Sequence, residues 1–134
     1  MVFEPHAPPP NRREFLDWYE QQIQWKEGHR YDSPDVTTRS LRAWYMDMIT
    51  EYPAMNGPYA SDDVDSPKVT DYSVGKVIVY ASFAWSEAEM AFKTMFMLAD
   101  KHRVGFFDVS SADGGVWLPD PTGGYFCLHG KDAS

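Results

Sequence analysis

The chain has 134 residues, 43% of them hydrophobic and 24% charged, values typical of one globular domain spanning residues 1–134. Its 12 Lys and Arg residues against 20 Asp and Glu residues give a formal net charge of −8, which repels nucleic acid and anionic lipid and attracts basic partners. No apolar stretch is long enough to span a membrane, the first residues lack the pattern of a secretory signal, and the single cysteine excludes an intramolecular disulfide. We therefore expect a cytoplasmic protein that binds neither nucleic acid nor membrane.

The first residues predict a short strand and then a helix. Val2 and Phe3 are apolar and form the expected strand. Asn11 with Glu14 three residues later resembles a capping box, and the apolar spacing near 3.6 that follows predicts a helix to about Trp25.

A second helix has the clearest apolar pattern in the chain. Thr37 or Thr38 caps its start, and Pro53 stops it. Its apolar stripe has the spacing of one wide helical face and consists of Leu41, Trp44, Tyr45, Met48, Ile49 and Tyr52. After a turn at residues 56–58 the chain is polar and acidic, so residues from about 59 to 72 are expected to form an exposed loop.

The second half of the chain predicts strands around a third helix. Ser86 and Glu89 form a capping box at the start of this helix, which ends at His102 with Gly105 as its left-handed stop. The expected strands cover residues 76–83, 106–109 and 116–118, with 125–128 left open as a last strand and a frayed tail from about 129.

This order of elements, β-α-α-β-α-β-β with one more strand left open, indicates an α+β fold. We expect a two-layer sandwich, ferredoxin-like or related. Three helices should lie on one face of a mixed or mostly antiparallel sheet.

The residues that could act as nucleophiles lack the surroundings that catalysis needs. Cys127 lies between Phe126 and Leu128, an apolar setting typical of a buried structural cysteine. Ser110 and Ser111 lack the flanking glycines of a hydrolase elbow and are interpreted as turn residues. We expect no catalytic residue and no cofactor.

The four histidines lack the spacing of a metal site. His29 with Asp32 could supply two ligands at most. His102, together with Lys101 and Arg103, complements the negative end of the preceding helix dipole without any catalysis. We therefore expect no bound metal.

Several segments of the chain resemble those of a known group of proteins. They are Phe15-Leu16-x-Trp18-Tyr19, Tyr31-Asp32-Ser33-Pro34, Tyr52-Pro53-x-Met55-Asn56-Gly57-Pro58, Ala84-Trp85-Ser86-x-Ala88-Glu89 and Leu98-Ala99-x-Lys101-His102-x-Val104-Gly105-Phe106-Phe107-Asp108-Val109. Through them the chain, to about Pro119, resembles small uncharacterised bacterial α/β proteins similar to the immunity proteins of polymorphic toxin systems, of the contact-dependent or rearrangement-hotspot type. The resemblance implies cytoplasmic action and protein binding, and it implies no catalytic residue.

The acidity, the missing motifs and the resemblance favour a protein-binding module that is not an enzyme. We expect an immunity protein or antitoxin that occludes the active site of a secreted toxin, with a basic toxin domain as its partner. The expected partner-binding residues are exposed acids with aromatic anchors nearby, namely Asp32, Asp35, Asp62, Asp63 and Asp65 with Tyr31 and Tyr59. No oligomeric state is predicted.

Two other functions stay open. A small enzyme or ligand-binding domain would place a deep polar pocket between Asp108–Ser111 and Asn56–Pro58. A structural or chaperone-like adaptor would display an apolar groove instead of an acidic patch.

Overall fold

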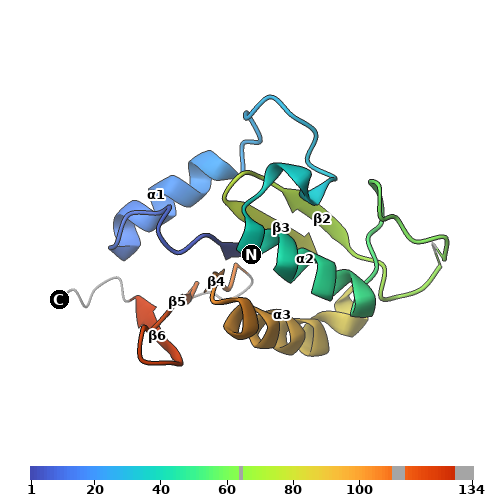
Figure 1. Ribbon diagram of the computed structural model, residues 1–134. Helices are drawn as coiled ribbons and strands as arrows, with labels where there is room; N and C mark the ends of the chain where they lie inside the picture. Colours follow the sequence, from blue (N-terminus) through green and yellow to red (C-terminus); the bar gives the residue numbers. More distant parts are fainter. Residues whose placement is uncertain (64, 110–113, 129–134) are drawn as a thin grey trace.

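The computed structural model describes residues 1–63, 65–109 and 114–128 (Figure 1). Its strands are β1 (Val2–Phe3), β2 (Asp71–Val74), β3 (Ile78–Ser82), β4 (Gly105–Phe107), β5 (Val116–Pro119) and β6 (Tyr125–Leu128). Its α-helices are α1 (Arg12–Gln22), α2 (Arg39–Glu51) and α3 (Ala88–His102), and two short 3₁₀ helices, η1 (Pro34–Val36) and η2 (Trp85–Glu87), precede α2 and α3. Within the described residues, no helix has the length and apolarity needed to cross a membrane.

The strands form one antiparallel sheet in the order β2-β3-β1-β4-β5-β6. Although β1 has only two residues, it lies in the middle, where Val2 and Phe3 pair with residues of both β3 and β4. The chain order β1-α2-β2-β3-α3-β4 is the β-α-β-β-α-β unit of a ferredoxin-like sandwich. The predicted α+β class is confirmed, with α1 inserted after β1 and a β5–β6 hairpin added at one edge.

The sheet carries a hydrophobic core on each face. Successive residues of a strand point to opposite faces, so Val2 packs in a core with α2 and α3, while Phe3 packs in a core with α1. The neighbouring strands are apolar on both faces as well, and both faces therefore need a cover. The structure corrects one detail of the prediction here, because α1 lies on the face opposite to α2 and α3 and the three helices do not share one face.

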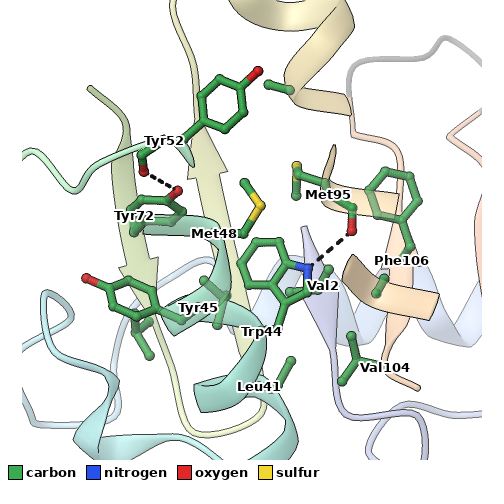
Figure 2. Packing of buried hydrophobic residues seen from close by; sticks show 14 of the residues in the cluster. Val2, Leu41, Trp44, Tyr45, Met48, Tyr52, Tyr72, Met95, Val104 and Phe106 are labelled. Carbon is green, nitrogen blue, oxygen red and sulfur yellow. Dashed lines mark hydrogen bonds between the residues drawn. The ribbon is translucent and has the colours of Figure 1, made fainter. Parts of the chain in front are cut away.

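The larger core is built on aromatic side chains, and two of them make hydrogen bonds within it (Figure 2). The indole Nε1 of Trp44 donates to the carbonyl oxygen of Met95 at 3.2 Å, and the Tyr72 hydroxyl donates to the carbonyl oxygen of Tyr52 at 2.7 Å. These bonds join α2 to α3 and to β2, and they satisfy groups whose burial would otherwise be costly.

The predicted starts of α1 and α2 are confirmed. The Asn11 side chain accepts a hydrogen bond from the backbone N–H of Glu14 at 2.9 Å, and the Thr38 hydroxyl accepts one from Leu41 at 3.4 Å. Helix α2 ends at Glu51, as Pro53 requires. Helix α1 ends at Gln22, earlier than expected.

The predicted end of α3 at His102 is confirmed, but the residues expected to cap the start and stop the end of this helix are wrong. Ser86 lies inside η2, and no side chain caps the start of α3. At the other end Arg103 takes the left-handed conformation, with a φ of 56°, and Gly105 is the first residue of β4. Glycine is required at position 105 for a steric reason, because a Cβ atom there would lie 2.3 Å from the ring of Phe3.

Part of the predicted acidic loop belongs to the sheet. Strand β2 begins at Asp71 and adds a strand to the predicted order, and Thr70 before it is buried. The backbone N–H of Thr70 donates to the carbonyl of Pro53, and the N–H of Met55 donates to the carbonyl of Thr70, each at 2.8 Å. These bonds close the loop at its base.

Candidate functional site

The structure brings together the two segments that hold the predicted partner-binding residues. Gly57 has a φ of 88°, and a Cβ atom on it would lie 1.9 Å from the carbonyl oxygen of Asp32. Arg30, Ser33 and Pro58 join these two residues in lining an open hollow of about 440 Å³. We refer to residues 30–35, 57–63 and 65 as the two-loop surface.

Asp32 is the least exposed acid of the two-loop surface. Its Oδ2 accepts a hydrogen bond from the guanidinium of Arg30 at 2.5 Å, and the side chain is 22% exposed. Its Oδ1 is buried and has no hydrogen-bond partner among the described residues. Burial, with the Asp32 carboxylate nearby, raises the pKa of Tyr45 to about 12. The Asp32 carboxylate thus faces partly into the protein and is only partly available to a binding partner.

The other four acids of the two-loop surface are exposed. They are Asp35, Asp62, Asp63 and Asp65. Within the described parts of the chain, none of their carboxylates forms an ion pair. Tyr59 is 45% exposed, with its ring centroid 6.3 Å from that of Tyr45. Exposed carboxylates beside a partly supported tyrosine can receive cationic side chains and an apolar contact together.

Tyr31 is held within its own loop. Its hydroxyl oxygen accepts a hydrogen bond from the N–H of Glu27 at 2.6 Å, and its ring lies against those of Trp25 and His29. Its carbonyl oxygen accepts from Val74 of β2 at 2.7 Å. Tyr31 therefore positions the two-loop surface and offers less contact area than the exposed Tyr59.

The two residues considered as metal ligands, His29 and Asp32, each pair with a different side chain. His29 Nε2 lies 2.5 Å from Glu27, while Asp32 pairs with Arg30. A hydrogen bond with the Arg30 carbonyl, and then one with Glu27, raises the pKa of His29. Among the described residues, no three His, Cys, Asp or Glu side chains group as a metal site would require.

An ion-pair cluster joins α2 to the end of α3. Asp47 Oδ2 accepts hydrogen bonds from Lys101 Nζ at 2.8 Å and from His102 Nε2 at 2.7 Å. Bonds from Lys101 and then His102 hold the pKa of Asp47 below its usual value. Lys101 and His102 at the end of α3 therefore interact with Asp47 of α2 as well as with the helix dipole. The sequence did not indicate the pairing with Asp47, because Asp47 is 54 residues away from Lys101.

The two segments of the alternative enzyme site lie in different hollows. Gly57 and Pro58 line the hollow next to Asp32, whereas Asp108 lines another one, beside β4 and α3. Ser110 and Ser111 lie outside the described residues. Cys127 pairs with Trp117 across the β5–β6 hairpin and is half-buried.

A second surface was not predicted from the sequence. Trp85 in η2 is 96% exposed, and Met90, Phe92 and Met97 of α3 are exposed as well. The buried positions of α3 are Ala91, Met95 and Ala99, whereas Phe92, which follows Ala91, is 40% exposed. An apolar run on a helix gives no direct signal of which flank stays open to solvent.

Comparison with family models, with curated protein sequences and with solved structures gives no match to this chain. The resemblance to immunity proteins therefore stays a prediction.

Proposed function

We propose that this chain is a cytoplasmic protein-binding module, an immunity protein that occludes the active site of a basic, secreted bacterial toxin, and that it has no enzymatic activity. The observation that carries the proposal is the two-loop surface, where four exposed carboxylates lie beside an exposed tyrosine. A net charge of −8 adds a long-range field that speeds encounter with a basic protein.

The geometry supports binding by occlusion better than chemistry. The contact between Gly57 and Asp32 holds these parts of the two segments against each other, so this part of the surface is preformed. Preformed surfaces bind with a smaller loss of conformational entropy than mobile ones. The hollow between the segments is open, which suits an inserted side chain from a protein partner.

The experiment is co-purification of the tagged chain with the product of the neighbouring gene, together with rescue of cells that express that product. We expect a complex and rescue. The absence of both would contradict the proposal.

A charge-reversal pair locates the contact. The double variant Asp62→Lys with Asp63→Lys should lower the association rate about tenfold or more, since steering by surface charge changes on-rates on that scale. The matched control is Asp17→Lys with Glu20→Lys on exposed positions of α1, which changes the net charge equally. Equal losses in both variants would place the effect in the overall charge and not in the two-loop surface.

A further inference from the structure

His29 has a hydrogen-bond acceptor facing each nitrogen of its ring. Nδ1 lies 2.6 Å from the carbonyl oxygen of Arg30, and Nε2 lies 2.5 Å from Oε1 of Glu27. A carbonyl oxygen and a carboxylate oxygen only accept, whereas a neutral imidazole carries one N–H and a histidinium carries two. Both contacts are therefore hydrogen bonds only when His29 is charged. With a neutral ring, the lone pair of one nitrogen would face an oxygen at hydrogen-bond distance.

The charged side chains that act on His29 come from two places. Glu27 lies in the same loop and favours the charged ring, whereas Lys76 lies in the turn between β2 and β3 and disfavours it. The ring of Tyr31 packs with its centroid 4.5 Å away, and 18% of the His29 side chain is exposed. The hydrogen bond with the Arg30 carbonyl, followed by the one with Glu27, raises the pKa of His29 above its ordinary value despite burial and Lys76.

Glu27 connects the loop after α1 to the sheet. Its Oε1, which contacts His29, also accepts a hydrogen bond from the backbone N–H of Lys76 at 3.0 Å. The N–H of Glu27 itself donates to the Tyr31 hydroxyl at 2.6 Å. A charged His29 thus holds the carboxylate that ties this loop to the turn between β2 and β3.

Two further hydrogen bonds tie the following residues to the same part of the sheet. The N–H of Val74 donates to the Tyr31 carbonyl at 2.7 Å, and the Thr37 hydroxyl donates to the Lys76 carbonyl at 3.1 Å. Neither bond contains a group that titrates near neutral pH. Loss of the His29 proton therefore loosens the residues before Tyr31 while the residues after it stay attached.

We propose that His29 and Glu27 form a pH-sensitive lock, which holds residues 27–30 against the turn between β2 and β3 while His29 is charged. The lock opens as pH rises, because a neutral ring cannot donate to both oxygens. This device goes beyond the proposed function, since it works in the free chain. It also reaches the two-loop surface, because the side chain of Arg30 pairs there with Asp32.

Opening of the lock is expected in a defined pH range. The pKa of His29 is raised in the folded chain, so the stabilisation is fully present below the unfolded-state pKa of about 6.5 and is lost as pH rises through the folded-state pKa. Between these two values the equilibrium constant for opening should rise by up to about tenfold per pH unit, since one proton is released. Above the folded-state pKa it should level off.

Two NMR measurements on the full chain, labelled with ¹⁵N, test the lock. At about pH 6.5 an ordinary histidine is half protonated, and long-range ¹H–¹⁵N spectra should show both ring nitrogens of His29 mainly protonated. Amide exchange of Lys76, corrected for the intrinsic rate at each pH, should accelerate as His29 loses its proton. His29→Gln should abolish this acceleration, and the matched control His6→Gln, at an exposed position, should keep it.

Two substitutions should move the titration in opposite directions while the backbone donor at position 76 remains. Glu27→Gln keeps an oxygen that can accept but removes the charge, so the pKa of His29 should fall. Lys76→Gln removes the opposing cation, so the pKa of His29 should rise. In each variant, the pH range in which the amide at position 76 accelerates should move with the His29 titration.

A charged ring, a shared pH range and opposite shifts in Glu27→Gln and Lys76→Gln support the lock. A His29 ring that is mainly neutral at about pH 6.5 overturns it. Exchange at position 76 that ignores the His29 titration, or accelerates equally in His29→Gln, also overturns it. Partner binding is decided separately by co-purification and rescue, so the lock and the proposed function can fail independently.

Discussion

Gly57 is the residue on which the two-loop surface depends. Its left-handed φ and its contact with the Asp32 carbonyl both exclude a side chain. We expect Gly57→Ala to lower the free energy of unfolding by about 1–3 kcal/mol, since a strained conformation and a backbone clash add together. Urea denaturation measures the loss. Association with the basic partner should weaken as well, because the acids move apart.

Gly28 provides the matched control for Gly57. It also has a left-handed φ, of 84°, but a Cβ atom there would meet nothing within 4 Å. Gly28→Ala should therefore show the conformational cost alone, about 1 kcal/mol. If the two variants lost equal stability, the contact between Gly57 and Asp32 would not be what holds the two loops together.

Among the helices and strands, the sequence predicts best those features that depend on hydrogen bonds between residues close together in the chain. Asn11 and Thr38 cap the helices they were expected to cap, because a side-chain oxygen acts on an N–H three residues away. The start of α3 could not be predicted in this way, since η2 supplies a preceding turn and Ser86 makes no cap. Strand β2 was missed for a related reason, because its place depends on pairing with β3 and its sequence is partly polar.

The cluster around Asp47 makes the stability of the α2–α3 pair depend on pH. The hydrogen bonds from Lys101 and His102 need the ionised carboxylate, so their contribution is present above the unfolded-state pKa of about 3.9 and is lost as pH falls through the lower pKa of folded Asp47. We expect Asp47→Asn to cost about 1 kcal/mol or less at neutral pH, because exposed ion pairs are screened. Urea denaturation at neutral and at acidic pH should show a smaller acid-induced loss in the variant than in the wild-type protein.

Asp100 is the control for Asp47. It pairs with Arg103 within the end of α3 at 2.7 Å and does not join the two helices. Asp100→Asn should keep the acid-induced loss attributed to Asp47. The interpretation fails if Asp47→Asn follows the wild-type pH profile while Asp100→Asn departs from it.

For the whole molecule, sequence patterns predict the class of fold better than the placement of its parts. The helices and the strands other than β2 follow from apolar spacing, and the α+β class follows from their order along the chain. The face that each helix covers depends on strand order, which arises from pairings between Val2–Phe3 and residues far along the chain. The acids of the candidate site were predicted individually, but Trp85 was not singled out, because exposure is a property of the folded chain.

The central place of β1 makes Phe3 a test of the whole architecture. Phe3 is fully buried, its ring packs 5.1 Å from that of Phe15, and it fills the space that Gly105 leaves open. Removing the ring leaves a cavity between the sheet and α1, so Phe3→Ala should cost about 3–5 kcal/mol in urea denaturation. Phe126→Ala, at an exposed position of the edge strand β6, is the control and should cost much less, since its ring is 44% exposed. Because β1 joins β3 to β4, amide exchange in both of these strands should accelerate together in Phe3→Ala, and acceleration confined to α1 would show that β1 does not unite the two halves of the sheet.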